Sequence, residues 1–252
     1  MHIHVPQQKS KETNLIFHRV ECLHTSQSNC SCNEKLETVK THKYLGVVID
    51  NKFKWSAHIQ ELRKKIRSSA YALHHLKYKV PETTLRNIYI ALVESHIRYC
   101  ITTYGTACKS EMEKINNSQK AILKNMLPHK YNHIKDDIDV FHYFNVLSAT
   151  ELYIYTVVTN NFFSMTFKNP TTHRQNTRLM TKNRLQVPRS NNSYGKKTRQ
   201  YQIPFIFNQL PPQLTDPEQI LNRKTKLSVG ISIIKERTRT WLCNKRNDDD
   251  DT

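Results

Sequence analysis

Paired carboxylates are the residues of this sequence that could hold catalytic metal ions. Asp136 and Asp137 form the internal acidic doublet, and a run from Asp248 to Asp251 lies near the C-terminus. Two-metal phosphoryl-transfer sites bind their ions through such pairs. Asp136 and Asp137, however, lie in a polar stretch and suit the first turn of a helix, where carboxylates interact favourably with the helix dipole. The terminal run has no apolar neighbours to position it, so we expect neither group to hold a metal.

Zinc is the second metal to consider, because four residues of suitable type lie close together: Cys22, His24, Cys30 and Cys32. Structural zinc sites use four such ligands. The Cys30–Cys32 spacing is nevertheless tighter than the usual pair with two intervening residues, and no second spaced pair follows. A zinc site and the metal-free tip of a long hairpin both stay open, with the hairpin favoured.

The start of the sequence lacks the charged and then apolar layout of a secretory signal. We therefore expect an intracellular protein, in the cytoplasm or the nucleus, whose six cysteines are reduced thiols. No run of about 18 apolar residues occurs, so no membrane partner is expected.

The charge balance favours a polyanionic partner. The chain has 39 Lys and Arg residues against 21 Asp and Glu, a net charge of +18. Such an excess favours nucleic acid through counterion release, and binding should weaken with salt. Between Glu151 and Asp216 no acidic residue occurs. The predicted contacts in this stretch are Arg178, Arg184, Arg189, Lys196, Lys197 and Arg199, with Tyr194 and Tyr201 as rings that could stack on unpaired bases. The alternative is a solvated basic loop without a particular ligand.

A short apolar strand precedes the helical part of the chain. Tyr44 to Ile49 is a β-branched run with the pattern of a strand buried on both faces. Gly46 has no side chain there and would let another backbone approach closely. Asp50 ends the strand, and Ser56 is placed to cap the helix that follows. A strand that admits a foreign backbone, joined to a cationic helix, favours a nucleic-acid grip.

Three helices are predicted after this strand. The first begins near residue 56, and its apolar residues recur at steps of three and four: Ile59, Leu62, Ile66, Ala70, Leu73 and Leu76. Lys64, Lys65 and Arg67 occupy the remaining positions, either as a solvated face or as phosphate contacts. The second helix starts near Pro81, and the residues expected along its buried side are Leu85, Ile88, Tyr89, Leu92, His96 and Ile97, with His96 as a hydrogen-bonded core residue. The third carries Met112, Ile115, Ile122, Leu123 and Met126 and ends before Pro128.

Further helices are predicted beyond residue 131. Ser148 and Glu151 form a capping box for one of them. Prolines then limit helices to short pieces, and Ile231 to Leu242 predicts a last helix that packs back on the rest. The predicted class is α+β and mainly α, with an N-terminal β-hairpin and strands, a helical bundle and a partly irregular helical C-terminal region.

The string Tyr44-Leu-Gly-Val-Val-Ile-Asp50, with Phe53, Trp55 and His58 after it, resembles one segment of a known family. That segment is the junction of palm and thumb in reverse transcriptases of jockey-like non-LTR retrotransposons. In that family the Leu-Gly pair belongs to the primer grip, a β-hairpin that holds the 3′ end of the growing strand. Leu45 and Gly46 match this pair.

Other blocks are similar to the family in the same order along the chain. Lys11 with Leu15 to Phe17 is similar to a strand whose lysine lies near the incoming nucleotide, although Glu12 stands where Ser or Thr is usual. The blocks that resemble the region after the thumb are Thr177-Arg178, Val187 to Arg189, Gly195-Lys196 and Phe207 to Pro211, with Phe207 where Trp is usual.

The resemblance implies three parts and a function. Residues 1–55 would be a palm remnant with the primer-grip hairpin, 56–127 a helical thumb and 128–252 a basic post-thumb region. The implied partners are an RNA template, an RNA–DNA hybrid or DNA primer, and the missing palm and fingers of the polymerase. The nucleic-acid contacts are then Lys11, Tyr44, Leu45, Gly46, Lys64, Lys65 and Arg67, together with the six cations named above from the acid-free stretch.

The same resemblance implies a fragment of an RNA-directed DNA polymerase without its catalytic aspartates. The family's aromatic-x-Asp-Asp turn, and the magnesium ions that it holds, are expected outside this sequence. We therefore expect no cofactor and no catalytic residue in this chain, and no polymerisation by it alone. Two alternatives stay open: a non-enzymatic nucleic-acid-binding protein derived from such an element, and an unrelated helical interaction protein whose matches are coincidental.

Overall fold

The computed structural model of the chain describes residues 3–4, 16–17, 39–134, 138–166, 185–211, 214 and 227–250. Several residues named above lie outside these ranges: Lys11, Cys22, His24, Cys30, Cys32, Asp136, Asp137, Arg178 and Arg184. Two short strands, β1 (Ile3–His4) and β2 (Ile16–Phe17), pair antiparallel. Within the described residues the chain is a β-hairpin followed by helices, so the predicted α+β, mainly α class is confirmed.

A two-residue turn divides the apolar run that predicted one strand. The strands β3 (Thr41–Tyr44) and β4 (Val47–Asp50) pair antiparallel, with Tyr44 opposite Val47. Leu45 and Gly46 form the turn between them, at φ values of 47° and 80°. The prediction of a single buried strand from Tyr44 to Ile49 was therefore wrong. Positive φ at both central residues is the requirement of a type I′ hairpin turn, which Asn-Gly usually meets.

The helix α1 (Ser56–Leu76) buries the predicted apolar stripe. Ile59, Leu62, Ile66 and Leu73 are buried, and the helix packs along α5 (Lys109–Met126). Ser56 does not cap α1, contrary to the prediction. The residue before the helix is Trp55, whose backbone is left-handed, and the Ser56 hydroxyl donates instead to Glu111 on α5 at 3.2 Å.

A π-turn interrupts the second helical segment and changes its buried face. The segment consists of α2 (Glu82–Tyr89), the π-helix η1 (Ile90–Glu94) and α3 (Ser95–Arg98). Its buried apolar residues follow steps of four: Leu85, Tyr89, Val93 and Ile97. His96 is exposed, so its prediction as a core histidine was wrong. A π-turn adds one residue to the helix, which moves each later side chain round the axis.

The chain then turns through the short helix α4 (Ile101–Tyr104) into α5. Gly105 follows α4 at a close approach to α7. A Cβ there would meet the Tyr153 ring at Cδ2 and lie 2.6 Å from the Ile101 carbonyl oxygen. The 3₁₀ helix η2 (His129–Ile134) and the short helix α6 (Val140–Tyr143) follow α5.

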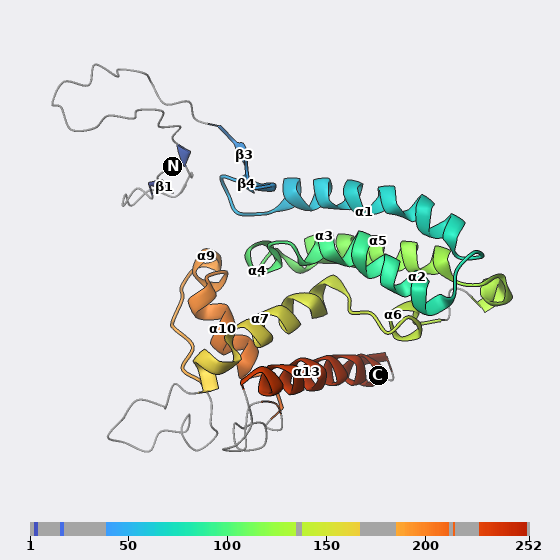
Figure 1. Ribbon diagram of the computed structural model, residues 1–252. Coiled ribbons are helices and arrows are strands. Elements are labelled where there is room, and N and C mark those ends of the chain that lie inside the picture. The colour runs from blue at the N-terminus through green and yellow to red at the C-terminus, as the bar shows by residue number, and fades with distance from the viewer. Residues whose placement is uncertain are drawn as a thin grey trace.

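The remaining helices pack on the other side of the bundle. These are α7 (Ala149–Thr166), α9 (Ser193–Lys196), α10 (Arg199–Phe207) and α13 (Leu227–Asp250). The predicted capping box begins α7, since Glu151 accepts from the Ser148 backbone N–H at 2.7 Å. The predicted last helix is confirmed, and it packs against α7. Figure 1 shows α1, the α2–α3 segment with α5, then α7 and α13 in successive layers, with α9 and α10 at one end.

One hydrophobic core runs through the described residues, from Val47 on β4 to Leu242 on α13. It includes residues from each of the three predicted parts of the chain. The boundaries near residues 55 and 127 stay predictions. No helix in the described part of the chain is long and apolar enough to cross a bilayer.

Candidate nucleic-acid interface

The tip of the β3–β4 hairpin is an exposed apolar surface. Tyr44, Leu45 and Tyr99 are 48%, 71% and 51% exposed. Tyr99 follows α3, and its hydroxyl donates to the Leu45 carbonyl oxygen at 2.6 Å. The Tyr99 ring therefore lies beside Leu45 and Gly46, where a Cβ added to Gly46 would meet only that ring, at 3.7 Å. Exposed rings of this kind can stack on a base or contact a ribose.

Leu45 occupies an uncommon backbone conformation for its side chain. Its φ of 47° lies in the left-handed region, which costs a residue with a Cβ about 1–2 kcal/mol. The side chain gains little from burial, because most of it is exposed. An apolar residue kept at a strained and exposed position is a reason to look for a binding role.

Hydrogen bonds of Asp50 and His58 fix the hairpin and the loop that joins it to α1. The Asp50 carboxylate accepts from the backbone N–H groups of Lys52, Lys54 and Trp55, at 3.0, 3.0 and 2.7 Å. These bonds hold the loop that joins β4 to α1. His58 Nδ1 accepts from the Val48 backbone N–H at 3.4 Å.

The His58 ring is buried at the base of the hairpin. It packs edge-on against Tyr104, with ring centroids 4.8 Å apart. Burial lowers the pKa of His58, opposed by the charge of Glu61 and supported by that of Lys65. The neutral imidazole is therefore the form that accepts the Val48 bond.

The outer face of α1 carries the predicted cations. Lys64, Lys65 and Arg67 are exposed, opposite the apolar stripe. Arg63 differs from them, since its Nε donates to Ser118 on α5 at 3.0 Å.

The same face continues with aromatic residues that the sequence analysis did not include. Tyr71 is 74% and Tyr78 is 56% exposed. Tyr71 packs edge-on against His75 at 4.2 Å, and Tyr78 stacks on His129 at 5.1 Å. The signal was available, because Tyr71 and His75 follow Lys64 at steps that keep them on one helix face, and Tyr78 comes just after the helix. We call Lys64, Arg67, Tyr71, His75 and Tyr78 the α1 strip.

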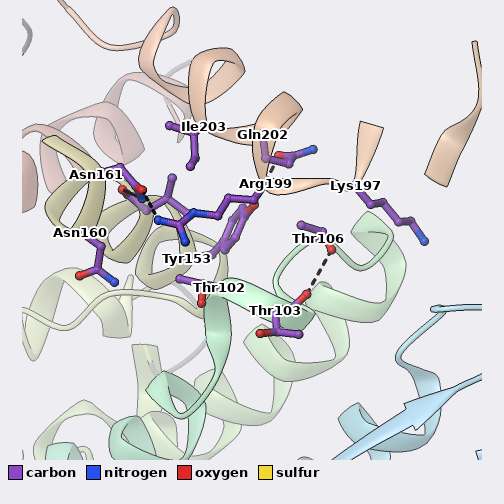
Figure 2. A pocket seen from close by; sticks show the side chains of 11 residues that line it. Thr102, Thr103, Thr106, Tyr153, Asn160, Asn161, Lys197, Arg199, Gln202 and Ile203 are labelled. Carbon is purple, nitrogen blue, oxygen red and sulfur yellow. Dashed lines mark hydrogen bonds between the residues drawn. The ribbon is translucent and has the colours of Figure 1, made fainter. Parts of the chain in front are cut away.

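Lys197 and Arg199, from the acid-free stretch, line a cavity of about 390 Å³ between α4, α7 and α10. Figure 2 shows Arg199 extending between Asn161 and Tyr153. Its Nη2 donates to Asn161 Oδ1 at 2.7 Å. Lys197 points away from that group, and its Nζ donates to the Phe53 carbonyl oxygen at 3.1 Å. We call this cavity the Arg199 pocket.

Among the described residues, the other predicted contacts of this stretch do not line the Arg199 pocket. Arg189 and Lys196 are exposed but do not line it. Tyr194 is 42% exposed, with Lys197 Nζ 6.0 Å from its ring. Tyr201 is only half-buried, and its ring stacks on Phe205 at 5.8 Å.

Metal ligands do not gather in the described part of the chain: no three His, Cys, Asp or Glu side chains there could hold one ion. The four residues weighed as zinc ligands lie outside that part.

The chain matches no protein-family model, no curated protein and no solved structure.

Proposed function

We propose that this chain binds nucleic acid as the template–primer part of an RNA-directed DNA polymerase of a non-LTR retrotransposon. The observation that carries the proposal is the exposed turn at Leu45 and Gly46, with Tyr44 and Tyr99 beside it. A strand end could lie against this surface because Gly46 leaves the approach open.

The α1 strip supports the proposal with charge and stacking surface. From Lys64 to His75 it spans 11 residue steps of α1, or about 17 Å of helix, and Tyr78 follows just after α1 ends at Leu76. That length corresponds to about five phosphates of one strand. Cations interleaved with exposed rings suit a nucleic-acid backbone and its unpaired bases.

Binding of a labelled RNA–DNA hybrid with a recessed 3′ end, followed by fluorescence anisotropy over a salt series, tests the proposal. Removing two charges of the strip, Lys64→Ala with Arg67→Ala, should weaken binding about tenfold and lower the slope of log K against log salt by up to about 1.8. The matched control removes the same charge from α13, as Lys235→Ala with Lys245→Ala. Equal losses in both variants would mean non-specific attraction, and salt-insensitive binding would contradict the proposal.

The two alternatives predict different preferences for the end of the bound duplex. The proposed primer-end role predicts tighter binding to a recessed 3′ end than to a blunt duplex of equal length. Equal affinity for both would favour the non-enzymatic alternative, which uses the same cations. No binding to either would favour an unrelated helical interaction protein.

Polymerisation by the chain alone is not expected, because the resemblance places the catalytic aspartates outside this sequence. A primed RNA template with magnesium and nucleotides should show no extension. Extension by the purified chain would overturn this part of the proposal.

A further inference from the structure

The Arg199 pocket is large enough for a small ligand, and polar side chains form much of its lining. Its volume of about 390 Å³ falls in the range of small-molecule sites, about 300–1,000 Å³. Its walls come from three separate elements: α4 and the turn after it, the middle of α7 from Tyr153 to Asn161, and α10 with the residues before it. Side chains from segments distant in sequence thus converge on one space.

The charge of the pocket selects for an anion. Arg199 is the cation that points into it, whereas Lys197 lines it but directs its Nζ to Phe53, and no carboxylate is among the described residues that line it. Asn161, which is only 4% exposed, holds the Arg199 guanidinium and donates its own Nδ2 to the Val157 carbonyl oxygen at 2.7 Å. The planar guanidinium is therefore pre-positioned, and one of its five N–H groups makes the Asn161 bond. No further acceptor for Arg199 lies among the described residues, so its other donors can bind a phosphate.

The rest of the lining suits a base and a ribose. Asn160 offers an amide that both donates and accepts, as the edge of a base does. Thr102 and Thr103 add hydroxyl groups on the opposite wall, both on exposed residues of α4. Inorganic phosphate would leave most of this volume and these groups unused.

We propose that the Arg199 pocket binds one unpaired nucleotide, with its phosphate at Arg199 and its base toward Asn160. This rests on the proposed function in that the nucleotide belongs to a bound strand. Lys197 links the pocket rim to the loop that follows β4, because its Nζ donates to the Phe53 carbonyl oxygen. That loop lies at the other end of β4 from the Leu45–Gly46 turn, so a strand held at the turn would run along the hairpin to reach the pocket.

Calorimetric titration of the full chain with nucleoside monophosphates, ribose 5-phosphate and inorganic phosphate tests the proposal. Nucleoside monophosphates should bind at least about tenfold more tightly than inorganic phosphate, since base contacts add to the phosphate contacts. Equal affinity for all three would overturn the proposal and leave a simple anion site.

Two variants locate the binding. Asn160→Trp fills the pocket from an exposed position on α7 and should abolish nucleotide binding, while Asn117→Trp on exposed α5 should leave it unchanged. Arg199→Lys keeps the charge but loses the planar fork, and should weaken binding about tenfold. Circular dichroism of each variant verifies that it is folded. Unchanged binding in folded Asn160→Trp would overturn the assignment to this pocket.

The two proposals fail separately. If nucleoside monophosphates do not bind while the hybrid still does, the pocket proposal is wrong and the hairpin interface stands. If the hybrid fails to bind but nucleoside monophosphates bind in an Asn160-dependent way, the pocket is a nucleotide site and its link to a bound strand is wrong.

Discussion

Leu45 combines two properties that stability alone would not select. Its backbone is left-handed, and its apolar side chain is 71% exposed. Asn adopts the left-handed region far more readily and is the usual partner of Gly in this turn. A leucine here therefore costs stability and supplies apolar surface, as a binding residue would.

Replacing Leu45 by Asn should separate these two effects. We expect the free energy of unfolding to rise by about 0.5–1 kcal/mol, because the turn strain is relieved. Affinity for the hybrid should fall about fivefold, because about 1 kcal/mol of apolar contact is lost. Urea unfolding and anisotropy measure the two quantities.

Leu92→Asn is the control for Leu45→Asn. Leu92 is also partly exposed, at 38%, but its backbone is helical. It should give no gain in stability and no loss of affinity. A Leu45→Asn protein that bound as tightly as the original would contradict a role of the hairpin tip.

His58 predicts a pH dependence of stability. Burial lowers its pKa in the folded chain below the ordinary value of 6.5. As the pH falls through 6.5, the unfolded chain takes up a proton at this site that the folded chain resists, so the free energy of unfolding decreases. The decrease stops once the pH has passed below the folded pKa. His58→Gln should flatten this part of the profile, by at most about 1.4 kcal/mol per pH unit.

The exposed His96 provides the matched comparison. His96→Gln makes the same substitution at an exposed position without the buried contacts of His58. Its profile of unfolding free energy between pH 7 and pH 5 should follow that of the original chain. A flattened profile in His96→Gln, or an unaltered one in His58→Gln, would assign the effect to another group.

At the scale of elements, the π-turn η1 explains where sequence periodicity was misleading. The residues Leu85, Tyr89 and Ile97 were correctly expected on the buried face. Leu92 and His96 were expected there too, but they are exposed, and Val93 is buried in place of Leu92. An ordinary α-helical period cannot anticipate one added residue, because the π-turn is set by the tertiary fit of the helix.

Deleting Leu92 should be tolerated better than an ordinary helix deletion. Without it, the buried residues return to α-helical spacing, since Val93 and Ile97 each move one position closer to Tyr89. Deleting the exposed Asn117 instead rotates half of α5 relative to its core and has no compensating π-turn. We expect ΔLeu92 to retain a cooperative thermal transition and ΔAsn117 to lose it, as measured by circular dichroism.

The hairpin turn was missed for a related reason. Leu-Gly lacks the Asn-Gly or Asp-Gly signal of a type I′ turn, and the β-branched residues after it predict a continuous strand. Only the resemblance implied a hairpin at this place. The structure has a hairpin there, and the family stays a proposal.

For the whole molecule, one arginine joins the C-terminal helix to the bundle. Arg246 on α13 donates from Nε to Glu151 Oε1 at 2.9 Å, and its Nη1 lies 3.5 Å from Asp139 Oδ2. Both carboxylates also serve helix starts, Glu151 at α7 and Asp139 at α6. The guanidinium, 5.3 Å above the Phe141 ring, thus connects three elements.

Arg246→Met should destabilise the chain by about 2 kcal/mol. It keeps side-chain volume but leaves two half-buried carboxylates without their cation, a loss reduced by the remaining solvent contact. Lys245→Met, at the exposed neighbouring position, should change the free energy of unfolding by less than about 0.5 kcal/mol. Urea unfolding of both variants decides whether Arg246 has this role.

Charge alone indicated two residues of the Arg199 pocket, and no local pattern could indicate the rest. The acid-free stretch singled out Lys197 and Arg199. Thr102 and Asn160 reach the same cavity only because α4, α7 and α10 pack together. Such convergence over about 100 residues of sequence depends on tertiary packing.

Gly105 limits how this sequence can diverge. Any larger side chain would push α4 away from the Tyr153 ring, and the space beside them would change shape with it. Among sequences related to this one, we expect glycine to be retained at position 105 while exposed neighbours such as Thr102 vary. An ancestor reconstructed without a glycine there would have had a different arrangement of these two helices.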